Sequence, residues 1–251
     1  MRTRRWMATL SLTLNAALAA PAALPHLSFD ARLLGIPASV QTVQAQKRED
    51  TPVPPFFPPR HLEALFGTGA APLGELDVYP VAGLLAQYPD PSDGMREQID
   101  TLRSLVKTGR APANLRDEMP FLPWQYAVQV LHAAVKPLNF PGVKGVRFLV
   151  GFISPGEVAP LGRRDVFYTF QGLSNDGKYD LEFWYNVSLP ELPLDAYAGP
   201  NQRVMDALLA GKDAGPEWVT SLDRTGRLLN RLGNDARLTR LDAFLRTVRL
   251  K

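Results

Sequence analysis

The feature that most constrains the fold of this chain is an aromatic hairpin pattern in residues 165–189. Two runs rich in aromatic residues flank Asp176-Gly177, a pair that favours the backbone angles of a tight β-turn. With these two residues as the loop, Phe170 faces Phe183 across the hairpin. A shift by one residue would set apolar rows against polar rows. The sequence therefore predicts a single register, with one face of the hairpin in the core and the other face mostly polar.

The polar face of the predicted hairpin combines hydrogen-bonding side chains with a tryptophan. An indole ring beside polar groups offers an apolar platform with directional partners, which suits sugars, peptides and small polar ligands. An ordinary solvent-exposed face, or a tryptophan covered by another segment, would give the same pattern. The candidate ligand-binding residues are Gln171, Asp180, Glu182, Trp184 and Asn186, joined by Arg147 from the neighbouring strand.

The rest of the pattern predicts an α+β fold. Apolar residues at helical spacing favour a helix over residues 93–107, with Asp93 as its cap and Gly109 after its end. We expect the helices to pack on the apolar face of an antiparallel sheet that has the aromatic hairpin at its centre, and the C-terminal region to be helical. The other expected strands are residues 75–81 and 146–153. The other expected helices are residues 125–135, 201–211, 221–232, which Pro216 could begin, and 238–248.

The first twenty residues have the pattern of a secretory signal peptide. Three arginines precede an uncharged apolar run that is too short and too interrupted to span a membrane, and small residues follow. We expect cleavage after Ala19, or after Ala45 if the leader is longer. The protein is therefore expected in the periplasm or the extracellular space.

Proline content sets the expected domain organisation. Proline fixes φ and donates no backbone hydrogen bond, so residues 21–60 are predicted to form a disordered or extended arm. Residues 1–20 are the predicted signal peptide, and residues 61–251 are predicted to form a single α+β domain.

Composition argues against several kinds of site. The chain has no cysteine, and its three histidines match no metal-binding or catalytic motif. We therefore expect no metal and no cofactor, and we expect His132 to lie on a helix beside the core. Loss of Arg2, Arg4 and Arg5 with the leader leaves 25 basic and 25 acidic residues, so no overall charge attracts nucleic acid.

A basic stripe near the C-terminus is a second candidate surface. Arg224, Arg227 and Arg231 recur at three- and four-residue spacing and so share one helical face. Such a face could contact an anionic lipid or envelope polymer, or it could be the solvated back of a helix whose leucines face the core.

One stretch of the chain resembles a family of uncharacterised exported bacterial proteins. The usual form in that family is a Phe-Tyr strand followed by Gln-Gly-Leu and Asp-Gly-Lys-Tyr, and residues 165–179 here read Asp-Val-Phe-Tyr-Thr-Phe-Gln-Gly-Leu-Ser-Asn-Asp-Gly-Lys-Tyr. The resemblance extends over about residues 75–251 and departs at Asp180, where relatives carry an aromatic residue. It implies export but no activity. The order of helix, hairpin and terminal helix is also similar to that of small exported PsbP-like α+β domains.

Together these patterns predict an exported binding or interaction module that is monomeric and uses no cofactor. Its expected partner is a small polar ligand, a peptide or an envelope polymer. The alternative is a carboxylate-based hydrolase in which Asp180 and Glu182 act as general acid and base.

Overall fold

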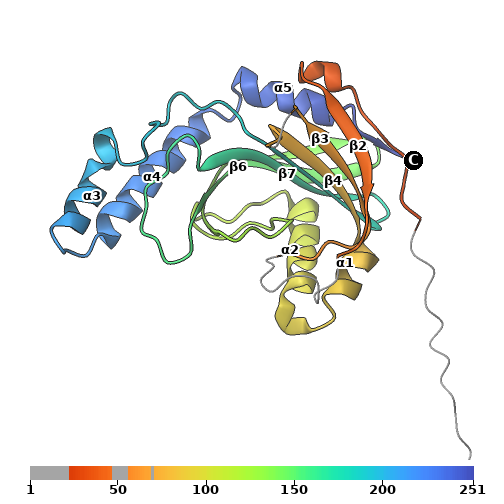
Figure 1. Cartoon of the computed structure of the whole chain (residues 1–251), viewed down its shortest axis with the longest axis horizontal. Coiled ribbons are helices and arrows are strands. Elements are labelled where there is room, and N and C mark those ends of the chain that lie inside the picture. The colour runs from red at the N-terminus through yellow and green to blue at the C-terminus, as the bar shows by residue number, and fades with distance from the viewer. Residues whose placement is uncertain (1–22, 47–55, 69–70) are drawn as a thin grey trace, which may run out of the picture.

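The structure is a computed structural model of the chain, and it describes residues 23–46, 56–68 and 71–251 (Figure 1). The predicted signal peptide and the cleavage site after Ala19 lie outside the described residues, as do residues 47–55 of the predicted arm.

A seven-stranded antiparallel sheet forms the centre of the molecule, with the strand order β2-β3-β4-β8-β7-β6-β5. Two further short strands pair with each other and hold the beginning of the described chain beside the C-terminus. The α+β class predicted from the sequence is confirmed. The sheet strands are β2 (Ala38–Val43), β3 (His61–Phe66), β4 (Gly74–Pro80), β5 (Val128–Phe140), β6 (Val143–Ile153), β7 (Val166–Ser174) and β8 (Tyr179–Tyr185), and the short pair is β1 (Leu27–Ser28) with β9 (Arg249–Leu250).

The aromatic hairpin is β7 and β8, and it has the predicted register. Phe170 faces Phe183, and Tyr168 faces Tyr185. Gly177 in the turn has a φ of 70°, in the left-handed region where glycine is favoured. Because β4 pairs with β8 and β6 pairs with β7, both hairpin strands are internal to the sheet.

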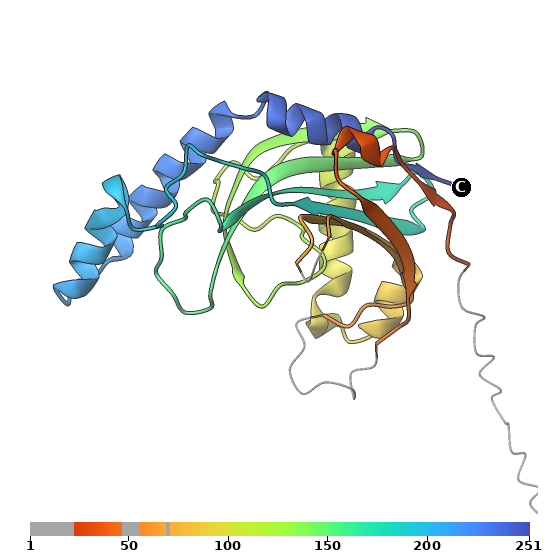
Figure 2. The same ribbon diagram turned by 45° about the horizontal axis from the view of Figure 1, so that its top comes forward.

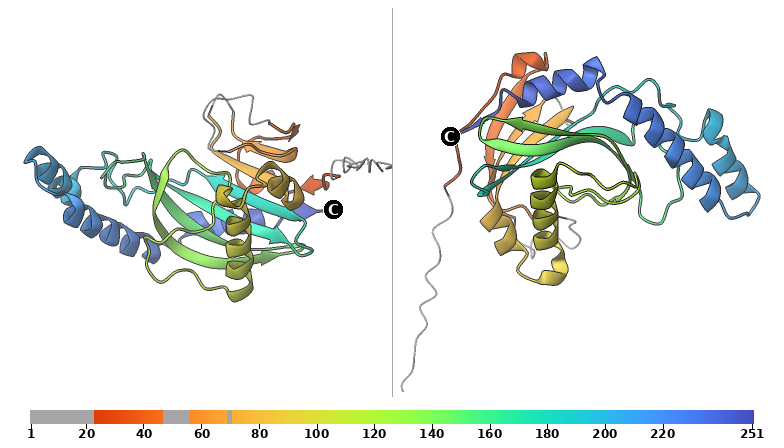
Figure 3. Two further views of the ribbon diagram at one scale, coloured as in Figure 1. Left: turned by 90° about the horizontal axis from the view of Figure 1, so that it is seen from below. Right: turned by 180° about the vertical axis from the view of Figure 1, so that it is seen from behind.

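Helices cover both faces of the sheet. On the apolar face, α4 (Gly215–Arg231) and α5 (Ala236–Leu245) contribute to the largest core cluster, in which Phe66, Phe183 and Phe244 contact one another. On the polar face, α1 (Val81–Gln87) and α2 (Met95–Thr108) pack with side chains of β4, β6 and β7. Figure 2 shows α5 along the top of the sheet, and the right-hand view of Figure 3 shows α2 below it.

The cover on the polar face is the main difference from the predicted architecture, which placed helices on the apolar face alone. Apolar side chains of α2, among them Ile99, Leu102 and Leu105, are buried against that face. The remaining helix, α3 (Gln202–Leu209), packs on α4 at the end that projects beyond the sheet (Figure 1).

Two predicted segments have a different structure. The helix expected over residues 125–135 is wrong, because most of that segment belongs to β5, and His132 lies buried on this strand rather than on a helix. Short apolar runs of this kind have no period that separates a buried strand from a helix. The arm expected over residues 21–60 contributes β1 and β2, so part of it belongs to the folded unit.

Candidate functional site

The central strands of the sheet bring five carboxylates together on the polar face. Successive side chains of a strand alternate between faces, so residues two apart on β3, β4 and β8 point the same way. Glu63 faces Asp77 across β3 and β4, and Asp77 faces Glu182 across β4 and β8. We call the group the carboxylate cluster, and its members are Glu63, Glu75, Asp77, Asp180 and Glu182.

Aromatic side chains of the same strands and of the neighbouring segments lie beside the cluster. Asp180 faces Tyr79, and Glu75 faces Trp184. The Tyr79 ring lies 4.5 Å from the His61 ring between centroids and 5.6 Å from that of Phe56, so aromatic groups border the cluster on the α1 side.

Burial separates the cluster into two parts. The exposed fractions of Asp77, Asp180 and Glu182 are 1%, 0% and 2%, whereas Glu63 and Glu75 are half-buried. Within the described part of the chain, no lysine or arginine pairs with any of the five. The buried part of the cluster therefore consists of acids without a cationic partner among the described residues.

Several oxygen atoms of the buried acids have no hydrogen-bond partner among the described residues. They are Oδ1 of Asp77, both carboxylate oxygens of Asp180 and both of Glu182. Buried polar atoms of folded proteins are nearly always satisfied, so five such atoms on one face of a sheet require an explanation.

The environment shifts four acids of the cluster, Glu75, Asp77, Asp180 and Glu182, toward their neutral forms. Burial raises the pKa of Asp180 to about 8. Burial, and then repulsion from neighbouring carboxylates, raises the pKa values of Asp77 and Glu182 well above their usual range. Burial also raises the pKa of Glu75. Each of these four groups is easier to protonate than usual, and a nearby positive charge would stabilise its ionised form.

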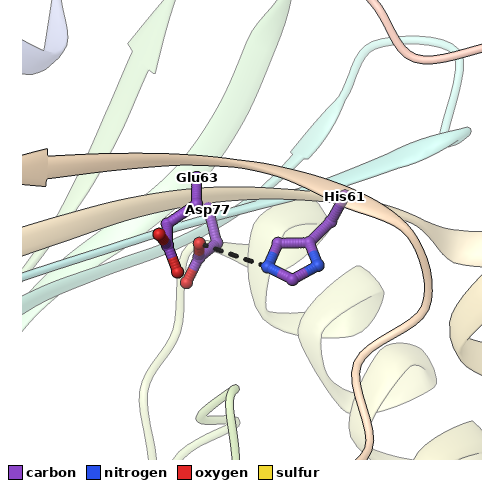
Figure 4. Close-up of side chains that lie close together, drawn as sticks. All are labelled: His61, Glu63 and Asp77. Atoms are coloured by element: carbon purple, nitrogen blue, oxygen red, sulfur yellow. Dashed lines mark ion pairs between the residues drawn. The ribbon is translucent and has the colours of Figure 1, made fainter. Parts of the chain in front are cut away.

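His61 stands at the β3 end of the cluster (Figure 4). Its Nδ1 lies 2.8 Å from the carbonyl oxygen of Pro59, and its Nε2 lies 3.8 Å from Oδ1 of Asp77. Burial lowers the pKa of His61, which favours the neutral imidazole. Donor atoms of His61, Glu63 and Asp77 all lie within 4.8 Å of one another.

The structure places the predicted site residues in different surroundings. Asp180, Glu182 and Trp184 lie together on the polar face, with Trp184 half-buried next to Phe167. Asn186 is exposed beyond the end of β8.

Gln171 shares the polar face with these residues but has a structural role. Its amide is buried, donates to the carbonyl oxygen of Leu122 at 3.1 Å and accepts from the Leu122 N–H at 3.0 Å. Gln171 thus fastens the segment that follows α2 to the sheet.

Arg147 lies on the opposite face, so the prediction that it joins the polar group is wrong. It faces Phe170 across β6 and β7 and is 1% exposed. Its Nε lies 3.2 Å from Oδ1 of Asp242 on α5, and its guanidinium donates to the carbonyl oxygens of Ala134 and Gly233. Arg147 therefore anchors α5 and the bulge of β5 to the sheet, and its interactions are structural.

The basic stripe lies on α4, but its three arginines are not equivalent. Arg224 is half-buried and donates to the carbonyl oxygen of Pro200 at 3.2 Å, whereas Arg227 and Arg231 are exposed. One of the three side chains is thus held by the protein itself, and the other two face solvent.

Sequence reasoning missed four of the groups that form the site, which are His61, Glu63, Glu75 and Asp77. The histidines match no metal-binding or catalytic spacing, and no motif includes Glu63 or Asp77. The available signal was polar alternation, since His61 and Glu63 are two residues apart, as are Glu75 and Asp77. The pairing of β3 with β4 then places them side by side.

The comparisons with known proteins give this chain no relative: no family model, no curated protein and no solved structure matches it. The resemblance to exported bacterial proteins stays a prediction, and the functional argument rests on the residues of the chain itself.

Proposed function

We propose that the protein is an exported binding module of the bacterial envelope or extracellular space, and that the carboxylate cluster is its ligand site. The ligand, or the part of it that enters the site, carries positive charge. The observation that supports this proposal most strongly is the set of oxygen atoms on Asp77, Asp180 and Glu182 that have no hydrogen-bond partner in the described part of the chain.

The energetics of burial support a binding role over a structural one. A buried carboxyl group without a partner lowers the stability of the fold, and apolar side chains of similar size at these positions would be tolerated at least as well. Residues that reduce stability in this way are typical of functional sites, where a ligand supplies the missing interactions. A cation would satisfy several oxygens of the cluster at once.

Binding of a small cation needs less space than hydrolysis of a substrate. The raised pKa of Asp180 is a property that a general acid needs. However, five cavities of the described chain have neither Asp180 nor Glu182 in their linings. A hydrolase needs space for a substrate and a water molecule beside its acid and base, so the hydrolase using Asp180 and Glu182 is the second candidate.

Export is supported by the signal-peptide pattern of residues 1–20. No helix in the described part of the chain is long and apolar enough to cross a membrane. Of the two proposed cleavage sites, the one after Ala19 leaves the sheet complete, whereas cleavage after Ala45 would remove β1 and β2. We therefore favour a mature chain that begins at Ala20.

A thermal-shift panel tests the proposed function. Chelator-treated protein at pH 7.5 is melted with Zn²⁺, Ca²⁺, spermidine or arginine as positively charged probes. At least one probe is expected to raise the melting temperature of the wild type and to have less effect on Glu182→Gln. Because a ligand that binds only the folded state stabilises it by mass action, a panel without any shift would contradict the proposal.

A further inference from the structure

The histidine in the cluster suggests what kind of cation the site takes. We propose that His61, Glu63 and Asp77 hold a divalent transition-metal ion, with Nε2 of His61 and the two carboxylates as ligands and Glu182 beside them. This inference rests on the proposed function and narrows its ligand class.

The ring of His61 is oriented as in a metal-binding histidine. Nδ1 lies 2.8 Å from the Pro59 carbonyl oxygen, which can only accept a hydrogen bond, so the ring proton is on Nδ1. Nε2 then carries the lone pair. A histidine whose second nitrogen donates to a backbone carbonyl is the usual arrangement around a bound metal, because that bond fixes both the tautomer and the ring plane.

The lone pair of His61 faces another acceptor. Nε2 lies 3.8 Å from Oδ1 of Asp77, and this oxygen has no hydrogen-bond partner among the described residues. Both side chains are almost completely buried, with exposed fractions of 3% and 1%. Two buried acceptors that face each other need a positive group between them, either a proton or a metal ion.

The spacing of the donor atoms suits a metal ion. Two ligands that are each about 2.1 Å from the same ion lie about 3 to 4 Å apart, depending on the angle at the ion. The distance from Nε2 to Oδ1 is within that range. One donor atom of each of the three residues lies within 4.8 Å of the other two, so a small side-chain movement would bring all three to one ion. Glu63 is half-buried and accepts a hydrogen bond from the neighbouring strand residue Gln41, so its carboxylate borders both solvent and the site (Figure 4).

The donor set indicates the class of metal. Two carboxylates neutralise the charge of a divalent ion, and an imidazole nitrogen favours zinc, copper, iron or nickel over calcium and magnesium, which prefer oxygen ligands. Three protein ligands leave at least one coordination position for water, for another side chain or for an external ligand. Glu182 faces Asp77 across the strands and could take such a position.

Calorimetric titration with Zn²⁺ tests the inference. Chelator-treated wild-type protein is expected to bind one equivalent of Zn²⁺ more tightly than Ca²⁺. Loss of a residue that hydrogen-bonds a metal ligand weakens metal binding about 10- to 100-fold. His61→Gln removes a ligand itself, so it is expected to weaken Zn²⁺ binding by at least about 100-fold. Glu63→Gln changes a half-buried residue and provides a second ligand variant if His61→Gln does not fold.

His132→Gln is the matched control. His132 is also buried, and its Nδ1 lies 2.9 Å from the Asp117 carbonyl oxygen, but no group of possible metal ligands in the described chain includes it. Its substitution should leave the affinity for Zn²⁺ unchanged. Equal affinity of the wild type, His61→Gln and Glu63→Gln would overturn the metal site, as would equal weakening by all three substitutions.

The outcomes separate this inference from the proposed function. If Zn²⁺ does not bind at His61 while spermidine, arginine or Ca²⁺ stabilises the protein through Glu182, the metal site is wrong and the binding function stands. If no probe raises the melting temperature in a way that substitutions in the carboxylate cluster reduce, both proposals fail.

Discussion

Substitution of Asp180 by asparagine should make the protein more stable at alkaline pH. The carboxyl group of Asp180 is completely buried, and both of its oxygens lack partners among the described residues. Asparagine has nearly the same shape and carries no charge at any pH of interest. The substitution therefore removes the titration of this group while it retains the packing.

The magnitude follows from the two pKa values of the group. Burial raises the pKa of Asp180 to about 8 in the folded protein, against an ordinary value of 3.8. A raised carboxyl pKa means that the folded state holds the proton where the unfolded state has lost it, so stability falls as pH rises between these values. Each pH unit in that range lowers the unfolding free energy by about 1.4 kcal/mol. From pH 5 to pH 8, the wild type should lose about 3 to 4 kcal/mol that Asp180→Asn retains.

Urea unfolding at pH 5 and pH 8, followed by tryptophan fluorescence in the presence of a chelator, measures this difference. Asp176→Asn is the control, because hydrogen bonding in the exposed hairpin turn lowers the pKa of Asp176 to about 2. Asp176 is therefore ionised in both states from pH 5 to pH 8, and its substitution should have the same effect at both. If the difference between Asp180→Asn and the wild type is also the same at both pH values, Asp180 is not a buried acid and the reasoning is refuted.

Three further predictions concern the sheet and the termini of the chain. Asp242→Asn leaves the buried guanidinium of Arg147 without its counter-charge and should lower the unfolding free energy by about 3 to 5 kcal/mol. Asp223→Asn, at the half-exposed pair with Arg116, should lower it by less than about 1 kcal/mol. Similar effects of the two substitutions in urea unfolding would contradict the anchoring role of Arg147. Gly172→Ala would place a methyl group 2.6 Å from Cζ of Phe170 and 2.9 Å from the carbonyl oxygen of Lys144. This crowding should lower the unfolding free energy by about 1 to 3 kcal/mol. A melting temperature equal to that of the wild type would show that the hairpin packs differently. N-terminal sequencing of the protein from the culture medium or periplasm should begin at Ala20, and a start after Ala45 would mean that the mature fold lacks β2.

Local patterns were sufficient to predict the hairpin and the fold class. The Asp176-Gly177 turn and the two-residue period of β7 and β8 fix their register, because the turn and the core face agree. Helical spacing likewise predicted α2 and the C-terminal helices to within a few residues. These elements carry their own signals and depend little on the rest of the chain.

The composition of the site depended on pairings that local patterns do not encode. Arg147 was assigned to the wrong face because residues 154–165 connect β6 to β7, and a connection of that length fixes no register. The polar face was expected to meet solvent or a ligand, and nothing in β8 reveals that α1 and α2 cover that face. His61, Glu63 and Asp77 become neighbours only through the pairing of β3 with β4.

Anomalous X-ray diffraction from crystals of the protein grown with Zn²⁺ tests the central claim most directly. Data collected on either side of the zinc absorption edge locate the ion without reference to any assumed site. We expect a zinc peak between Nε2 of His61 and the carboxylates of Glu63 and Asp77. A carboxylate cluster without zinc, in crystals that bind the ion only at exposed side chains, would contradict it.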